Sequence, residues 1–272
     1  MTNVNCFRCG VLNLVADEMC RVCGIELRPP GLLQPEPAAD RNTTFIASIP
    51  PLSRARDVIE PTIQLFLKNL WLITRIVFVV VAPFEVFKAL SVGRPDDGWQ
   101  TAGVFALGLL CKALIAPALI YALMKVMQTG TAPGVNEAYR WGLSKLGKLI
   151  LCALMAWGLT VLGLVMLIIP GIILTLAFEL VFPMAILEKH SPKATLRRSY
   201  ELTKGHRWNI LVAGIVMAFI VGVIGIPVTM LFPANGPIWQ LNVVSAIITD
   251  ILEQSKTVLS LVIYLSILRT LE

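Results

Sequence analysis

Long runs of apolar residues alternate with short polar and basic stretches from residue 69 to residue 269. A helix needs about 20 mainly apolar residues to cross the roughly 30 Å hydrocarbon core of a bilayer. The candidate spans are Leu70–Leu90, Ala102–Met127, Leu149–Ile169, Ile172–Leu187, Ile210–Phe232 and a last one that ends at Leu268. The pattern therefore predicts an all-α integral membrane bundle of about six transmembrane helices within residues 55–272.

The third and fourth predicted spans belong to one almost unbroken apolar run from Leu149 to Leu187. As a single helix this run would be about 58 Å long, nearly two hydrocarbon cores. The run must therefore fold back on itself, and Pro170-Gly171 is the predicted turn.

The last apolar segment, from Ile238 to Leu268, is too long for one upright span and contains Asp250, Glu253 and Lys256. Counting about 20 residues back from its C-terminal end places Asp250 near the far interface. We therefore expect residues 238–249 to be interfacial or steeply tilted, while the rest makes the crossing.

Composition agrees with a membrane protein, because charged residues make up 15% of the chain and soluble domains average about 25%. The formal charge of +6 does not indicate nucleic-acid binding, because most of the excess lies beside apolar runs. One predicted side of the membrane holds Arg54, Arg56, Lys68, Lys125, Arg140, Lys145, Lys148, Lys189, Lys193, Arg197, Arg198, Lys204, Arg207 and Arg269, and the other holds Lys88 and Arg94. Positively charged loops stay in the cytosol, so both termini are predicted to lie on the cytosolic side of the cytoplasmic membrane.

Two Cys-x-x-Cys-Gly motifs near the N-terminus predict a small metal-binding unit in residues 1–28. They contain Cys6, Cys9, Cys20 and Cys23. Each motif is a tight turn that directs two thiolates at one point, and four thiolates in a tetrahedron suit structural Zn²⁺. So short a segment cannot bury a core, so the metal would supply its folding free energy, roughly 10–16 kcal/mol.

Two alternatives to zinc remain open for these cysteines. Rubredoxin-type iron sites use similar motifs with a longer intervening chain, and the four residues could also form two disulfides. The predicted cytosolic location is reducing, which disfavours disulfides. The motifs resemble the zinc ribbons found at the N-termini of many bacterial membrane proteins.

Residues 29–54 are predicted to be a flexible, extended linker because they are rich in proline. The chain is thus divided into a zinc ribbon at 1–28, a linker at 29–54 and a membrane domain at 55–272.

Short amphipathic helices are predicted before the third and fifth spans, with a weaker copy before the first. The second of them starts at Ser191-Pro192, a helix cap followed by a favoured first residue, and Gly205 ends it. Such helices can lie in the headgroup layer and bind anionic lipid. The candidate headgroup contacts are Lys193, Arg197, Arg198, Lys204 and Arg207. Alternatively, these residues form a basic loop that only fixes the topology.

The region from Ile169 to Trp208 resembles a known group of membrane proteins. The matching residues are Glu188, Arg197, Arg198, Ser199, Thr203, Lys204, Gly205 and Trp208, with Tyr264 and Arg269 near the C-terminus. They are similar to those of the YciC-like proteins, which are related to the membrane domain fused to some glycerophosphodiester phosphodiesterases. The resemblance implies an architecture and no particular activity, since the catalytic phosphodiesterase domain is absent from this sequence.

No catalytic constellation stands out, and the chain is predicted to be non-enzymatic. His190 and His206 flank the basic helix, while Cys111 and Cys152 fall inside predicted spans and suit packing. The favoured function is a membrane scaffold or adaptor whose ribbon docks a cytosolic or membrane protein. The alternatives are a small-molecule transporter or channel, and a lipid-associated enzyme or accessory factor. A buried ion pair with no aqueous path would favour the scaffold, a polar path through the bundle the transporter, and a carboxylate cluster with His at a membrane face the lipid-associated role.

Two charged residues inside the predicted spans form a candidate buried pair. Counted from the outer edge, Lys112 lies about 15 Å deep and Glu179 about 12 Å deep. A single charge at the centre of the membrane costs about 2.5–3.5 kcal/mol on insertion scales, which favours pairing. The sequence therefore predicts that Lys112 pairs with Glu179, with Glu85 and Glu253 as shallower rival partners.

Overall fold

A computed structural model describes residues 3–5, 12–14, 49–91, 98–231 and 239–270. The chain divides into two compact units, Met1–Asp40 and Arg41–Glu272. In the first unit, β1 (Asn3–Asn5) pairs antiparallel with β2 (Leu12–Leu14), with Asn3 opposite Leu14. The four predicted zinc ligands, Cys6, Cys9, Cys20 and Cys23, lie outside the described residues.

The second unit is helical throughout its described part. Its helices are α2 (Arg56–Lys68), α3 (Leu70–Ser91), α4 (Gly98–Thr129), α5 (Val135–Met166), α6 (Ile168–Ala177), α7 (Val181–Leu187), α8 (Pro192–Thr203), α9 (Arg207–Leu231) and α10 (Trp239–Thr270). Six segments of the described chain are long and apolar enough to cross a membrane: Leu70–Lys88, Ala106–Thr129, Val135–Met166, Ile169–Leu187, Arg207–Leu231 and Val243–Thr270. The prediction of a multi-pass helical membrane protein is confirmed at this level.

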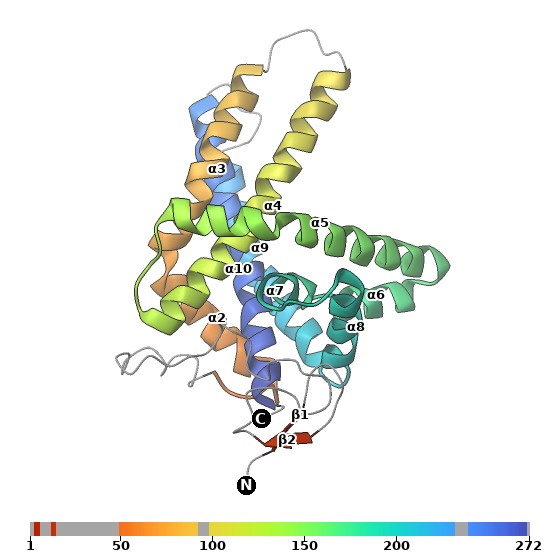
Figure 1. The fold of residues 1–272 in the computed structure, drawn as a ribbon. Coiled ribbons are helices and arrows are strands. Elements are labelled where there is room, and N and C mark those ends of the chain that lie inside the picture. The colour runs from red at the N-terminus through yellow and green to blue at the C-terminus, as the bar shows by residue number, and fades with distance from the viewer. Residues whose placement is uncertain (1–2, 6–11, 15–48, 92–97, 232–238, 271–272) are drawn as a thin grey trace. The chain divides into compact units, whose positions relative to one another are not determined.

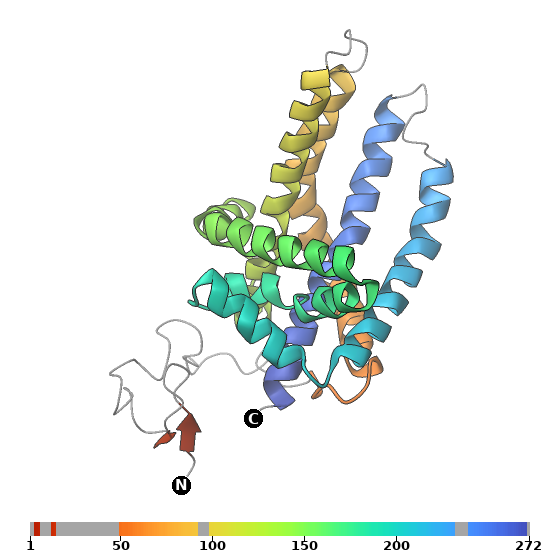
Figure 2. The ribbon, with the colours of Figure 1, turned by 90° about the vertical axis from the view of Figure 1, so that its right-hand side faces the viewer.

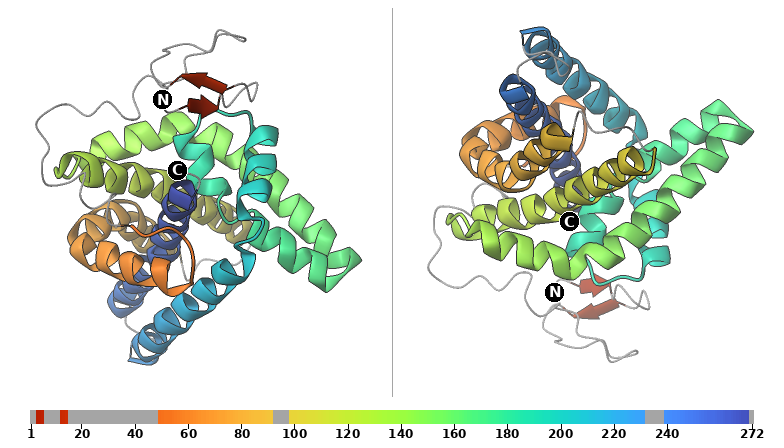
Figure 3. Two further views of the ribbon diagram at one scale, coloured as in Figure 1. Left: turned by 90° about the horizontal axis from the view of Figure 1, so that it is seen from below. Right: turned by 90° about the horizontal axis from the view of Figure 1, so that it is seen from above.

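The four helices α3, α4, α9 and α10 run side by side along one axis (Figures 1 and 2). The last residues of α3 and α9 and the first residues of α4 and α10 lie at the same end of these four helices. We call it the loop end. The opposite end holds α2, α8 and the last residues of α10, and we call it the α8 end. Helices α5 and α6 run crosswise to the other four, as the views along the long axis also show (Figure 3).

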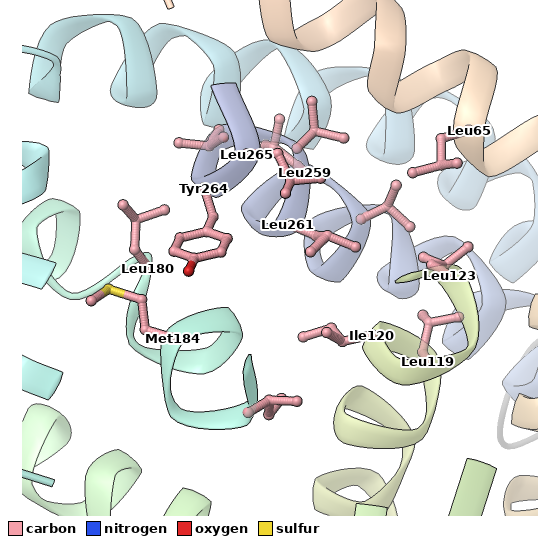
Figure 4. Close-up of a cluster of buried hydrophobic side chains, with 14 of the residues drawn as sticks. Leu65, Leu119, Ile120, Leu123, Leu180, Met184, Leu259, Leu261, Tyr264 and Leu265 are labelled. Atoms are coloured by element: carbon pink, nitrogen blue, oxygen red, sulfur yellow. The ribbon is translucent and has the colours of Figure 1, made fainter. Parts of the chain in front are cut away.

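The buried core lies toward the α8 end. It joins Leu119, Ile120 and Leu123 of α4 to Met184 of α7 and Leu261 of α10, all of them fully buried (Figure 4). Toward the loop end the side chains of α4 and α9 are largely exposed, as lipid-facing helices should be.

The hairpin turn differs from the predicted one. Helix α5 ends at Met166, Leu167 is extended, and Pro170-Gly171 lies in the first turn of α6. Proline is tolerated there because the first turn of a helix does not use its N–H groups internally. Gly171 instead allows close packing of the two arms, since a methyl group on it would overlap with Leu164 of α5.

The predicted fourth span is broken into two helices. Helix α6 ends at Ala177, and α7 begins only at Val181. Pro183 explains the break, because it cannot donate to the carbonyl of Glu179 and its ring would clash with that carbonyl.

Of the two predictions for residues 238–249, a separate interfacial segment is wrong where the structure describes them, and a steep tilt stays a prediction. Residues 239–270 form one continuous helix, α10, so the polar side chains of Asp250 and Glu253 do not interrupt it. The amphipathic helix before the fifth span is confirmed as α8: the Ser191 hydroxyl accepts from the Ala194 N–H, Pro192 is the first residue, and Gly205 has a φ of 94°. The one before the third span is the first part of α5, and the weaker copy is α2.

The last residues of the predicted linker pack against the membrane domain. Ile49 and Leu52 are fully buried. The hydroxyl of Ser266 donates to the carbonyl of Pro50 (2.6 Å), and Arg269 donates to the carbonyl of Ile49 (3.0 Å). Residues 49–54 therefore belong to the membrane domain, and the earlier part of the predicted linker lies outside the described residues.

Candidate functional sites in the membrane domain

The first site is an ion pair between two of the upright helices. The Nζ atom of Lys112 on α4 lies 2.6 Å from Oδ1 of Asp250 on α10, and 3.8 Å from Oε2 of Glu253. Asp250 and Glu253 face the same side because they lie three residues apart on a helix. The side chain of Asp250 is 7% exposed and that of Lys112 is 52% exposed. The pair thus joins α4 to α10 between the loop end and the core.

The predicted partner of Lys112 is therefore wrong. Glu179 lies at the break between α6 and α7, and the neighbouring Ala177 carbonyl accepts a hydrogen bond from Ser199 of α8 (2.6 Å). Glu179 is thus held near the α8 end, whereas the depth count assumed an unbroken upright span. Asp250 was missed because the same kind of count placed it at the far interface, although α10 is longer than a single span requires.

A second intramembrane contact neutralises another carboxylate. Glu85, which is buried, lies 2.5 Å from Lys88 one turn later on α3. An ionised side chain in hydrocarbon is costly unless it finds a partner. Lys88, Glu85, Lys112, Asp250 and Glu253 are therefore all in contact with an opposite charge.

The second site is a polar cluster around Glu188 at the α8 end. Glu188 caps the C-terminus of α7, and its Oε1 accepts a hydrogen bond from the hydroxyl of Tyr264 on α10 (2.9 Å). Its Oε2 lies 3.1 Å from Nε2 of His190 and 3.2 Å from Nε of Arg198 on α8. Lys148 of α5 donates to the Glu188 backbone carbonyl (2.6 Å). One residue thus links α5, α7, α8 and α10.

The local sequence explains this arrangement. The Ser191-Pro192 cap starts α8 just after α7 ends, which turns the chain back on itself. Two helical turns are then enough to bring Arg198 over Glu188. The next residue, Ser199, is fully buried and ties α8 to the end of α6.

The Glu188 cluster has the features of a structural site. Oε2 of Glu188 and Nε of Arg198 are both buried. They form an ion pair, but their geometry does not make a hydrogen bond. Oε1 of Glu188 accepts the hydrogen bond from Tyr264, and Oε2 is buried beside His190 and Arg198. The structure brings together three residues quoted for the family resemblance, Glu188, Arg198 and Tyr264. Lys148 and His190 were not predicted to take part, although His190 lies only two residues from Glu188 in the sequence.

The structure divides the five predicted headgroup contacts into two groups. Lys193, Arg197 and Lys204 are exposed, and Arg197 also pairs with Glu201 (2.9 Å). Arg198 instead turns inward to Glu188. Arg207 stacks on the ring of Tyr200 at 4.5 Å, and its Nε and Nη2 are buried without a hydrogen-bond partner.

Two exposed aromatic residues lie on α8 and at the start of α9, the helix that follows it. Trp208, at the start of α9, is 72% exposed, and Tyr200 of α8 is partly exposed. Trp and Tyr are enriched where membrane meets water, and Lys and Arg contact headgroups there. This surface therefore has the composition of a membrane interface.

Within the described residues, no group of three or more His, Cys, Asp or Glu side chains could hold a metal ion. Cys111 and Cys152 carry free thiols, and Cys152 is buried between helices as a packing residue.

No protein-family model matches the chain, and neither a curated protein nor a solved structure matches it significantly.

Proposed function

We propose that the protein is a non-enzymatic scaffold of the cytoplasmic membrane, with a structural zinc ribbon on the cytosolic side that docks a partner protein. The observation that carries the proposal is the Lys112–Asp250 ion pair. A charge that served transport would need a polar path, whereas these two side chains satisfy each other between two packed helices.

The Glu188 cluster supports the same proposal. It fixes four helices relative to one another and leaves the carboxylate occupied by Tyr264, His190 and Arg198. A general acid or base must be within reach of its substrate, so a carboxylate that is bonded to Tyr264 through Oε1 and buried at Oε2 suits a rigid platform better than an enzyme.

The exposed face of α8 adds a lipid contact to the proposal. Lys193, Arg197 and Lys204 would hold anionic headgroups on the cytosolic side, with Trp208 in the interface. The YciC-like architecture remains part of this proposal. It is supported by Glu188, Arg198 and Tyr264, three residues of the resemblance that lie together in the Glu188 cluster.

The test compares the partners of the wild type with those of a ribbon variant in cells. Cys6→Ser with Cys23→Ser removes two of the four proposed zinc ligands, and Cys111→Ser is the matched control outside the ribbon. Cytosolic-side crosslinking followed by mass spectrometry should show neighbours that disappear in the ribbon variant and persist in the control. If the neighbours are unchanged while zinc is lost, the ribbon is not the docking element.

A transport role is tested separately with Lys112→Leu combined with Asp250→Leu. A scaffold keeps its neighbours in that variant because the charges serve only to join α4 to α10. Loss of a solute-uptake phenotype with the neighbours unchanged would favour the transporter instead.

A further inference from the structure

We propose that the α5–α6 hairpin does not cross the membrane but is a single-leaflet anchor, entering the acyl chains from the α8 end. The chain then crosses the bilayer four times, through α3, α4, α9 and α10. The proposal does not depend on the function proposed above.

The length of α6 sets the first limit. Helix α6 has 10 residues and is therefore about 15 Å long, half of the hydrocarbon thickness. Its last residue, Ala177, is tied to α8 by the buried hydrogen bond from Ser199. Even if the hairpin stood upright, its turn at Leu167 could reach only about the middle of the bilayer.

The position of α5 on α4 sets the second limit. Gly142 of α5 packs directly against Ala118 of α4, where an added methyl group would lie 3.1 Å from the Ala118 nitrogen. Ala118 is about 30 Å along α4 from its start at the loop end, one hydrocarbon thickness away. Because the hairpin also runs crosswise (Figure 1), it lies at the level of the leaflet nearest α8.

The exposed surface of the hairpin is apolar, as a surface covered by lipid should be. No charged residue occurs from 149 to 178. At the turn, Val165, Met166, Leu167 and Ile169 are 67–78% exposed. A helix that rested on the headgroups would need a polar face, and this one has none. Acyl chains are therefore the occupant that fits it.

Lysines occur at the end of the hairpin that is opposite to its turn, where its two arms would leave the lipid. Lys145 and Lys148 precede the apolar part of α5, and Lys189 follows α7. The turn itself, around Leu167, carries no charge. Both arms therefore enter and leave on the same side, as a re-entrant segment does.

The test uses cysteine variants of the full-length protein in sealed vesicles of both orientations, probed with an impermeant maleimide. Leu167→Cys reports the turn, Asp97→Cys the loop end, and Lys193→Cys the α8 end. We expect Asp97→Cys to label from one side and Lys193→Cys from the other, while Leu167→Cys labels from neither. A nitroxide on Leu167→Cys should collide with oxygen more than with a water-soluble nickel chelate. Leu167 packs against little, so the variant should elute from a sizing column in detergent like the wild type.

Each other outcome overturns the proposal. Labelling of Leu167→Cys from the loop end would mean that the hairpin crosses and that the chain has six spans. Labelling from the α8 end as fast as Lys193→Cys would place the hairpin in water. Efficient crosslinking of Leu167→Cys between two chains would show that a second copy, not lipid, covers the turn.

Discussion

The Lys112–Asp250 pair gives the most direct test of the arrangement of the upright helices. Lys112→Leu leaves Asp250, which is 7% exposed, without its cation at 2.6 Å. Asp250→Leu leaves the Lys112 ammonium with Glu253 as its remaining carboxylate in the described residues, at 3.8 Å. Breaking a buried pair costs about 3–5 kcal/mol, and an unpaired charge in the membrane about 2.5–3.5 kcal/mol. Because Lys112 is half exposed, we expect a loss at or below the lower end of both figures, about 2–3 kcal/mol for each single variant.

The double variant isolates the interaction between the two residues. Replacing both charges with leucine removes the desolvation cost together with the attraction, which is often nearly neutral. We therefore expect the double variant to lose at most about 1 kcal/mol, so the coupling free energy is at least about 3 kcal/mol. The assay is unfolding in mixed detergent micelles, with the free energy of unfolding measured for all four proteins.

Two controls fix the interpretation. Glu253→Gln should lose less than about 1 kcal/mol, since Glu253 is the more distant and more exposed of the two carboxylates. A cycle between Lys112 and Glu179 should show additive effects within about 0.5 kcal/mol, as for residues not in contact. The reasoning would be refuted if the Lys112 and Asp250 effects also simply added.

Three further outcomes are expected. Purified protein should hold about one zinc ion per chain, and Cys6→Ser with Cys23→Ser should lose it without affecting membrane insertion, as metal analysis of membrane fractions will show. Tyr264→Phe should lower the free energy of unfolding by about 1–2 kcal/mol, because it removes the hydrogen bond to the buried Glu188 carboxylate, and an equal stability of both proteins would contradict that bond. Hydrogen bonds from Ser53, and from the Arg54 N–H, lower the pKa of Asp57 below its usual 3.8, so ionised Asp57 stabilises the fold above that pH. This contribution, under about 1 kcal/mol at so exposed a site, should fade as the pH falls further and be absent in Asp57→Asn.

Hydropathy was sufficient to find the apolar helices, because each one carries its own signal of length and composition. The break before α7 also has a local cause in Pro183, which could have been read from the sequence. The partner of Lys112 could not be predicted from the sequence, because it depends on which helices become neighbours. Counting residues to estimate depth assumes upright, unbroken spans of about 20 residues. Helix α6, with 10 residues, is shorter than such a span, and α10, with 32 residues, is longer.

The Glu188 cluster shows a similar division. The residues that mark the family resemblance were recognised as a set, but their roles became visible only when α10 brought Tyr264 to the end of α7. Lys148 joins from α5 through a backbone carbonyl, a contact that no side-chain pattern encodes. Of the five predicted headgroup residues, Arg198 and Arg207 carry the same charge as their exposed neighbours, and only the burial pattern of α8 and of the start of α9 distinguishes them.

The hydrogen bonds that hold residues 49–52 affect how the protein can be made. They join Ile49, Pro50 and Leu52 to residues of α10 that lie 216–220 positions later in the chain. Contacts of such high sequence separation form late, and during synthesis they must wait until the last helix has emerged. Until then the hydrogen bonds from residues 49–52 to α10 cannot form. Full burial of Ile49 therefore requires that α10 has been made and has docked, and limited proteolysis of the N-terminal side would report that step.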